Sequence, residues 1–589
     1  MRRFASLGVV CLLLSGTAAA GSLQRTVSGP QRSFVDGLRG LRMASSADLE
    51  KAAAKTLTLS AETGHRPAVL LETDYYVYEG SDTPTVRLSL DPNGYPMPVS
   101  LYFYWENRAN GARNYIANGQ VLAAGVVQDM FGNAGMPLAV WAPAFDNLEL
   151  YGTAGAYGEG PSNPTGMYQF VLEVRDYTGE SVLARGNAMY AHVDDIVTVP
   201  GDITTDTTWT NNNAYYLNKA PVYIGGDPIN GTPVPTTLTI QPGTFVYGSK
   251  ANQGTLVVVR DSKIIANGTA MLPIVFTSES VVGERGPGDW GGLVLNGNAP
   301  INVTGGEGDG EGNSGPYGGD DPNDSSGVLN YVRVEFAGIR FSELNELNGI
   351  AFQGVGAGTE CSNIEVLFNQ DDGVEFFGGT VNCENLFLYN NEDDSVDWTE
   401  GFRGYLRNVV VVQNQPDADS GIEADNWENG FDNQPRSMPK IYNATFIGNQ
   451  QESVAPGHGN RYRRGTGCIS RGFIIMNFGG AGIRVDDPET YALMGTELVM
   501  SNSIVYDNAT NFGGTDPAAV QTWFEDPAAL NQVTDPMLAD PFNSLVPNVT
   551  PLPGSPARDA SWAGTGGYIG GVDPNHPFIY DGWTIFSDN

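Results

Sequence analysis

Basic residues are scarce in this sequence: 31 Lys and Arg stand against 67 Asp and Glu, for a formal net charge of −36 at pH 7. A chain this acidic repels phosphate backbones, which excludes nucleic acid as a partner. Histidine is also scarce, with four residues in 589, and no close Cys and His spacing indicates a zinc site. Beyond the N-terminus, no segment has the roughly 20 consecutive apolar residues that a membrane-spanning helix needs. We therefore expect no membrane span.

The first 20 residues have the three parts of a secretory signal peptide. Two arginines at 2–3 precede an apolar run that ends at Leu14, and three alanines occupy 18–20. This order of basic, apolar and small residues is typical of a cleaved export signal. We expect a secreted protein, placed in the extracellular space, on the cell surface or in the periplasm. Residues 21–65 then form a linker or arm.

Residues 66–200 alternate between apolar and polar positions. Every second residue is apolar or aromatic over 99–105 and again over 168–174, and Asn-Gly pairs stand at 93–94 and 110–111. Period-two alternation interrupted by Asn-Gly turns is typical of antiparallel strands joined by hairpins. The pattern predicts a β-sandwich accessory domain.

A repeated unit dominates the chain after residue 200: an asparagine, five mostly apolar residues and a second asparagine. Copies start at residues 363, 385 and 408, which are 22 and 23 residues apart, and again at 443 and 502. A repeat of this length is one coil of a solenoid whose coils each add a strand to a parallel sheet. The sequence predicts an all-β protein with a parallel β-helix at 201–508 and a closing segment at 509–589.

The repeated asparagines have a structural explanation. Asparagine tolerates left-handed backbone at a sharp corner, and its amide can hydrogen-bond an identical amide in the next coil. Equivalent residues of adjacent coils are about 4.8 Å apart, which permits such stacking. We expect these asparagines to support the fold and not to take part in chemistry.

The chain resembles the pectate-lyase-like right-handed parallel β-helix proteins that bacteria secrete. The resemblance covers residues 201–589 and rests on the asparagine repeats, on DWGGLVLNGNAPIN at 289–302 and on the ending at 535–561. It implies a right-handed solenoid. It leaves the activity open, because this group includes lyases, hydrolases, adhesins and surface proteins.

Two cysteines, Cys361 and Cys383, each precede a repeat asparagine by two residues. They occupy equivalent places on adjacent coils, and the coil spacing falls within the Cα separation that a disulfide tolerates. We predict a disulfide between them, with two stacked free thiols as the alternative.

Acidic residues follow the first repeats and align from coil to coil. Asp371 aligns with Asp393, Asp372 with Asp394, and Glu375 with Asp397; the third coil adds Asp419 and Glu423. Alternation sends the flanking apolar residues inward, so these carboxylates face outward. We call these eight residues the carboxylate ladder. Because like charges one coil apart cannot all stay ionised without compensation, the ladder must bind cations, have raised pKa values or attract arginines such as Arg403 or Arg407.

Three interpretations of the ladder remain open: a solvated acidic face, a calcium site and a catalytic set. Calcium prefers clustered carboxylate and carbonyl oxygens. In the calcium interpretation the ligands are Asp372, Glu375, Asp394, Asp397 and Glu423. A glycine-rich acidic stretch at 305–327 is either a calcium-ordered loop or a flexible insertion.

The catalytic interpretation rests on a resemblance to polygalacturonase-type hydrolases, which carry Asn-x-Asp-Gly and, one coil later, an Asp-Asp pair. It implies an acid and base set of Asp371, Asp372, Asp393 and Asp394. Two features depart from that pattern: residues 369–373 are one residue longer, and no histidine follows one coil after the pair. Candidate substrate-binding residues are Arg403, Trp427, His458 and Arg484.

The composition, the repeats and the ladder together favour a secreted β-helix protein that binds an extracellular polysaccharide or surface polymer with Ca²⁺. The first alternative is a polysaccharide-cleaving enzyme, a hydrolase or a lyase, that uses the ladder aspartates. The second is a structural surface protein whose acidic face keeps it soluble. The oligomeric state does not follow from the sequence.

Overall fold

Strands dominate the protein. The computed structural model describes residue 44 and residues 66–586, without 74–75, 80–84, 94, 96, 118–119, 123–124, 132, 134–139, 142–144, 152–164, 282, 343–344, 416, 451–456 and 560–566. The predicted signal peptide and almost all of the predicted arm lie outside the described residues. The two α-helices of the described part are α3 (Pro488–Tyr491) and α4 (Pro517–Phe524). Among the described residues, no helix combines the length and the apolar character that crossing a bilayer takes.

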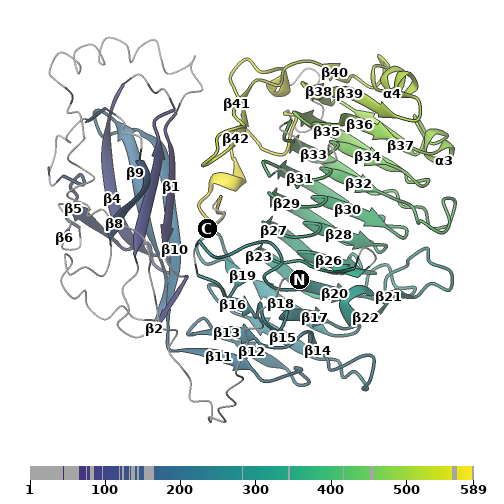
Figure 1. The fold of residues 1–589 in the computed structure, drawn as a ribbon, viewed down its shortest axis with the longest axis horizontal. Coiled ribbons are helices and arrows are strands. Elements are labelled where there is room, and N and C mark those ends of the chain that lie inside the picture. Colours follow the sequence, from purple (N-terminus) through teal and green to yellow (C-terminus); the bar gives the residue numbers. More distant parts are fainter. Residues whose placement is uncertain are drawn as a thin grey trace, which may run out of the picture.

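Two sheets form the N-terminal part, on the left in Figure 1. The smaller sheet consists of β1 (Ala68–Thr73), β3 (Val86–Asp91) and β8 (Phe145–Tyr151). The larger sheet consists of β2 (Val77–Glu79), β10 (Val182–Val193), β9 (Gly166–Asp176), β4 (Pro98–Asn107), β5 (Arg113–Ala117), β6 (Gln120–Val121) and β7 (Val140–Trp141). Alternate residues of both sheets, among them Leu88 and Phe170, bury their side chains in one shared core. All strand pairs are antiparallel except β2 with β10.

Two long parallel sheets form the rest of the fold, on the right in Figure 1. The first has 16 strands: β11 (Asp195–Val199), β12 (Thr207–Trp209), β13 (Asn213–Leu217), β15 (Thr237–Ile240), β16 (Phe245–Gly248), β18 (Lys263–Asn267), β19 (Ile274–Ser278), β23 (Gly327–Glu335), β27 (Glu360–Leu367), β29 (Asn382–Tyr389), β31 (Tyr405–Val412), β33 (Lys440–Ile447), β35 (Cys468–Met476), β37 (Leu498–Ser501), β38 (Ile504–Tyr506) and β40 (Gln532–Val533). The second has ten: β14 (Val222–Ile224), β17 (Thr255–Val258), β20 (Gly292–Asn296), β26 (Ile350–Gln353), β28 (Val374–Phe377), β30 (Val396–Thr399), β32 (Ile422–Ala424), β34 (Asn460–Tyr462), β36 (Ala481–Val485) and β39 (Thr510–Gly514). The predicted parallel β-helix is confirmed. Its strand pairing extends somewhat past both ends of the predicted range 201–508.

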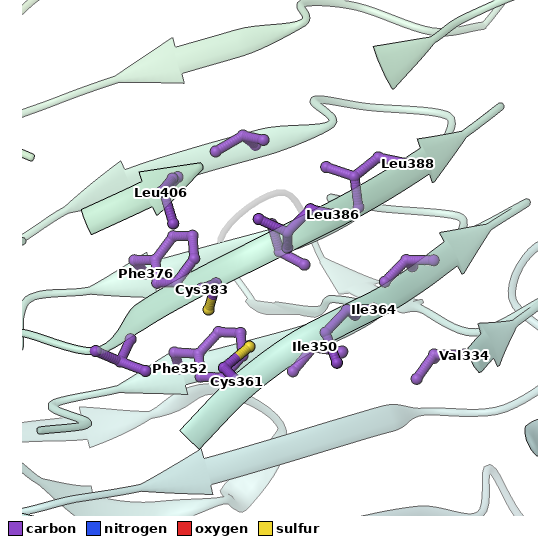
Figure 2. Packing of buried hydrophobic residues seen from close by; sticks show 14 of the residues in the cluster. Val334, Ile350, Phe352, Cys361, Ile364, Phe376, Cys383, Leu386, Leu388 and Leu406 are labelled. Atoms are coloured by element: carbon purple, nitrogen blue, oxygen red, sulfur yellow. The ribbon is translucent and has the colours of Figure 1, made fainter. Parts of the chain in front are cut away.

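The interior of the solenoid is a dry column of apolar side chains, one set per coil. Phe352 stacks on Phe376 at 5.0 Å between ring centroids, and Phe376 stacks on Phe402 at 4.3 Å. Figure 2 shows Cys361 and Cys383 beside these rings, pointing into the core from adjacent strands. The two cysteines are register partners, as predicted, but both are buried free thiols. The predicted disulfide is therefore not present, and the alternative of stacked thiols describes the structure.

The repeated asparagines lie where strands of the 16-stranded sheet bend. The backbone φ of Asn363, Asn385 and Asn408 is 53°, 60° and 55°, in the left-handed region that the sequence predicts. Their amides form a chain across the coils: Asn385 donates to Asn363 over 2.9 Å, and Asn408 donates to Asn385 over 2.8 Å. These residues fix the corner and satisfy one another's polar groups.

Two insertions interrupt the early coils near the second sheet. One contains β21 (Gly308–Gly310), the 3₁₀ turn η1 (Glu311–Asn313) and β22 (Gly315–Tyr317); the other is the antiparallel pair β24 (Ile339–Ser342) and β25 (Asn345–Leu347). The backbone N–H of Gly312 donates to Asn345 over 2.8 Å. The two insertions are thereby joined beside the turns that begin β26 and β28.

The C-terminal residues close the solenoid and then return along its side. Helix α4 buries Val520 and Phe524 against the last coil. The later segment, which includes β41 (Leu538–Asp540) and β42 (Asn548–Pro551), lies between the N-terminal sheets and the solenoid in Figure 1. Residues 567–586, here called the return segment, pack Ile569, Val572 and Ile579 against the outer face of the 16-stranded sheet.

The return segment replaces one link in the asparagine chain. The hydroxyl of Tyr568 donates to Asn408 over 3.1 Å, and the Tyr568 carbonyl accepts from Asn443 over 3.1 Å. Further along, the Ile585 N–H donates to the buried carboxylate of Glu365 over 3.0 Å. The segment is therefore held by polar contacts at both of its ends.

Candidate functional site

The carboxylate ladder lies in the turns that lead into strands of the ten-stranded sheet and at the second residue of three of these strands, β28, β30 and β32. Register pairs Glu375 with Asp397 and Asp397 with Glu423, as the alignment of the repeats predicts. The same column then continues with Arg461 and Arg484. We call these five positions the outer column. Its first three members are acidic and its last two are basic.

A second column, the inner column, lies two residues before each strand. One backbone hydrogen bond recurs along it: Gly349 N–H to the Asp372 carbonyl, Gly373 N–H to that of Asp394 and Gly421 N–H to that of His458. The inner column therefore runs through Asn348, Asp372, Asp394, Ser420 and His458. The third predicted coil contributes Ser420 at this level, with Asp419 beside it.

Asp372 and Asp394 each connect two coils through one carboxylate oxygen. The Oδ1 atom of Asp372 accepts the backbone N–H of Asp394 over 3.1 Å, and Oδ1 of Asp394 accepts that of Ser420 over 2.7 Å. Within the described part of the chain, neither Oδ2 atom accepts a hydrogen bond. Each carboxylate can therefore hold its neighbouring coil and still offer one oxygen to a ligand.

The ladder oxygens approach one another closely in three groups. Within each group the oxygens lie within 4.8 Å of one another: Asp371, Asp372 and Asp393; Asp372, Asp394 and Asp397; Asp393, Asp394 and Asp419. Each pair of groups has one aspartate in common: Asp372, Asp393 or Asp394. The three groups therefore form one continuous cluster. Oxygen-only donors at this spacing match the coordination that Ca²⁺ prefers.

Burial and mutual repulsion raise the pKa values of seven ladder residues: Asp371, Asp372, Glu375, Asp393, Asp394, Asp397 and Glu423. Burial is the larger cause for Asp372, Asp394 and Asp397, whose pKa values lie well above the usual range, and neighbouring carboxylates add to it. Burial together with Glu346 and Asp393 raises the pKa of Asp371 to about 8. Close carboxylates that are short of cations must hold protons or bind metal.

One arginine lies over the acidic end of the ladder. Arg340, in β24, places Nη2 3.2 Å from Asp393 Oδ2 and 3.7 Å from Asp371 Oδ1. Its Nε also pairs with Glu346 of β25. Arg340 therefore bridges two adjacent coils of the ladder.

Further arginines lie at the other end. Arg461 pairs with Glu423 at 2.8 Å and with Asp486 at 3.3 Å. Arg463 contacts Glu423 and pairs with Asp425 at 2.7 Å. Glu423, a predicted metal ligand, is consequently held by two guanidinium groups.

His458 and Arg484 meet beside the inner column. The Nδ1 atom of His458 accepts the Ala481 N–H over 2.9 Å, and its Nε2 lies 3.2 Å from Arg484 Nη1. Burial first, and then Arg484, lowers the pKa of His458 to about 4. A neutral ring that accepts at Nδ1 carries its proton at Nε2, so two donors face each other there and both can serve one acceptor.

The insertions bring further acids to the ladder. Burial first, and Glu346 among other causes, raises the pKa of Glu311 in η1 to about 7. Burial also raises the pKa of Glu400 to about 7, although Glu400 accepts a hydrogen bond from Tyr317 over 2.8 Å. The start of the ladder is consequently more acidic than the repeats alone indicate.

The predicted residues divide into two sets. The four predicted catalytic aspartates and the predicted ligands Asp372, Glu375, Asp394 and Asp397 come together in the ladder. Arg403 is exposed in the turn after β30, Arg407 is exposed in β31 and pairs in register with Glu384, and Trp427 lies in the loop after β32. The arginines that neutralise the ladder are Arg340, Arg461 and Arg463, which the repeat alignment does not identify.

A buried amide adds a further oxygen at the acidic end. Asn348 is 1% exposed, and its Nδ2 donates to Glu375 over 2.6 Å. Its Oδ1 has no hydrogen-bond partner among the described residues. An unpaired buried carbonyl oxygen is costly unless it has a ligand. Asn348 therefore supports the fit of an oxygen-preferring cation to this site.

The comparisons with known proteins identify the solenoid. The family described as pectate-lyase like beta helix domain matches residues 201–534, which is more than half of the chain. A search of curated proteins and a search of solved structures each found no match. The matched range contains every strand of both long parallel sheets except β11, together with the whole carboxylate ladder. The chain belongs to the pectate-lyase-like β-helix family.

Proposed function

We propose that this protein is exported and binds an extracellular polysaccharide along the carboxylate ladder, with Ca²⁺ shared among the ladder carboxylates. Family membership indicates a polysaccharide-related function. The proposal goes beyond family membership in three respects: that the protein binds the polymer, that Ca²⁺ is the ion, and that the protein is exported. The observation that most supports the proposal is that carboxylate oxygens of Asp372, Asp394 and Asp397 lie within 4.8 Å of one another.

The energetics of these three aspartates support a bound cation. Three ionised carboxylates at this distance repel one another strongly, and burial strengthens the repulsion. In the absence of metal, burial first and this repulsion second favour the protonated form, so the pKa values are raised. A divalent cation relieves it at neutral pH and leaves the carboxylates ionised. Ca²⁺ accepts six to eight oxygen ligands in flexible geometry and can fill its shell with water and sugar oxygens.

The charge pattern of the outer column supports an anionic polymer. A chain that lies along the solenoid axis meets the cation-bearing carboxylates first and then Arg461 and Arg484. Both halves favour carboxylate groups, the first through Ca²⁺ and the second through guanidinium. The paired donors of His458 and Arg484 offer two hydrogen bonds to one such group. A polyuronate is the simplest polymer with this chemistry.

Calcium-dependent stability tests the cation. The full chain, freed of metal with EDTA, is expected to show a rising Tm as CaCl₂ is added, because a ligand that binds only the native state stabilises it. In Asp394→Asn the amide oxygen can still accept the Ser420 N–H, but the charge is lost, and the rise should shrink strongly. Asp432→Asn, at an exposed position, is the matched control. An unchanged Tm in the natural protein, or an equal rise in Asp394→Asn, would contradict the proposal.

A polysaccharide-cleaving enzyme is the second candidate, favoured by Asp371. With a pKa of about 8, Asp371 holds a proton at neutral pH, as a general acid must. Against an inverting mechanism, the oxygens of each group lie within 4.8 Å of one another, whereas such enzymes hold their carboxyl groups about 6.5–9.5 Å apart. One panel of acidic and neutral polysaccharides separates the candidates. Binding without new reducing ends supports the first, and reducing ends that vanish in Asp394→Asn support the second.

A further inference from the structure

Arg340 occupies the position that a cation would take at one end of the ladder. Its Nη2 atom lies 3.2 Å from Asp393 and 3.7 Å from Asp371, which belong to two adjacent coils. Both aspartates are members of one oxygen group, whose third member is Asp372. A guanidinium between two carboxylates supplies the same compensation as a metal ion, with directional hydrogen bonds in place of coordination.

The next group along the ladder lacks this arrangement. Asp372, Asp394 and Asp397 approach within 4.8 Å of one another, and no ion pair to any of the three occurs in the described part of the chain. Arg463 interacts with Asp397 electrostatically, at a distance longer than that of an ion pair. The ladder thus has one group with a built-in counter-ion and one without.

An independent observation indicates a ligand at this end of the ladder. Asn348 precedes Asp372 in the inner column, is 1% exposed and points its amide at Glu375. Its Oδ1 is unpartnered among the described residues. The oxygen is the kind of donor that a hard cation takes, and a guanidinium, which only donates, is an equally suitable partner for it.

We propose that Arg340 is an internal counter-ion that competes with Ca²⁺ for Asp371 and Asp393 and thereby sets the affinity of this second calcium site. This inference rests on the proposed function. The first Ca²⁺ binds at Asp372, Asp394 and Asp397, where no arginine has to leave. Binding at Asp371 and Asp393 requires the Arg340 side chain, which is 48% exposed, to move into solvent. A negatively charged sugar favours that movement because it offers the released guanidinium a new partner.

Calcium titration of an arginine variant tests the inference. Isothermal titration of the EDTA-treated full chain at low ionic strength compares the natural protein with Arg340→Gln, Arg340→Lys and Arg407→Gln. Arg340→Gln is expected to bind the second Ca²⁺, at Asp371 and Asp393, at least about fivefold more tightly, because the competing ion pairs are gone, while the first binding step stays unchanged. Arg340→Lys keeps the charge and should fall between the two. Arg407→Gln makes the same change in net charge on the other sheet and should match the natural protein.

The outcomes separate the two proposals. If Ca²⁺ binds the natural protein and Arg340→Gln with equal affinity and stoichiometry, Arg340 is no competitor, while the calcium site stands. If neither protein binds Ca²⁺, the proposed function fails and this inference fails with it. If Arg340→Gln does not fold, Arg340→Lys decides: tighter binding than in the natural protein supports competition, and equal binding contradicts it.

Discussion

At the scale of single residues, Arg463 lies where the outer column changes from acidic to basic residues. It pairs with Asp425 at 2.7 Å and contacts Glu423, whose side chains are 7% and 12% exposed. Replacing Arg463 with Gln removes the guanidinium that contacts both carboxylates, while Arg461 stays on Glu423 and Arg464 stays on Asp425. We expect the free energy of unfolding to fall by about 2 kcal/mol, the usual cost of losing hydrogen bonds to charged groups. Urea denaturation in EDTA measures it.

Arg407→Gln is the control for this loss, since Arg407 is exposed on the other sheet. Substitution at such a surface position changes stability by about 0.5 kcal/mol or less. Added Ca²⁺ should recover part of the loss in Arg463→Gln, because Glu423 then keeps only Arg461 as an ion-pair partner and can turn its other oxygen to the ion. Equal losses in the two variants would mean that Arg463 does not neutralise the ladder.

Individual ladder residues follow from the sequence only where the repeat is regular. Alignment on the asparagines places Glu375 over Asp397 correctly because no insertion separates the two coils. Arg340 is not found this way, because it belongs to an insertion without an equivalent in the next coil. His458 follows Asp394 by 64 residues, which implies a distant loop. In the fold it lies two residues before β34, two coils beyond Asp394, because a long insertion after β32 accounts for the difference.

At the scale of elements, the turn asparagines combine a backbone role with a side-chain role. Asn385 has a φ of 60°, donates to Asn363 and accepts from Asn408. Asn385→Gly loses the amide contacts but has no Cβ to strain in left-handed backbone, and it should cost about 1 kcal/mol. Asn385→Ala loses the same contacts and keeps a Cβ there, so it should cost about 1–2 kcal/mol more than glycine. Thermal or chemical unfolding of both variants separates the two roles. Equal costs would show that the backbone conformation contributes nothing.

The repeat predicts the coils well and the cysteine chemistry less well. Equal spacing from the repeat asparagine places Cys361 opposite Cys383, and register confirms it. The spacing does not specify how the sulfur atoms are oriented. Both side chains lie in the core beside Phe352 and Phe376, and both are free thiols. Burial raises the pKa of Cys383 well above its usual value, which disfavours the thiolate that oxidation requires.

At the scale of the whole molecule, the raised carboxyl pKa values predict how stability depends on pH. The pKa is about 8 for Asp371 and about 7 for Glu311 and Glu400, against ordinary values near 4 in the unfolded chain. Between these limits the folded state binds more protons than the unfolded state. The free energy of unfolding therefore falls as pH rises from about 4 to 8 in the absence of metal.

Calcium should weaken this loss of stability with rising pH. Protons and Ca²⁺ compete for the same oxygens, so saturating Ca²⁺ is expected to flatten the fall in Tm toward pH 8, and calcium affinity should rise with pH. Differential scanning calorimetry from pH 4 to 8, in EDTA and in CaCl₂, measures both effects. A Tm in EDTA that rises over this range would contradict the assignment of protons to the ladder.

The return segment has a consequence for the order in which the protein is made. Tyr568, Ile579 and Trp583 follow every coil in the chain, yet they cover the apolar outer face of strands that begin near residue 327. During synthesis from the N-terminus, that face stays exposed to water until residues 567–586 have emerged. The solenoid can form coil by coil, but the outer face of its 16-stranded sheet is covered last. A prematurely terminated chain would keep this apolar face exposed and would be prone to aggregation or proteolysis.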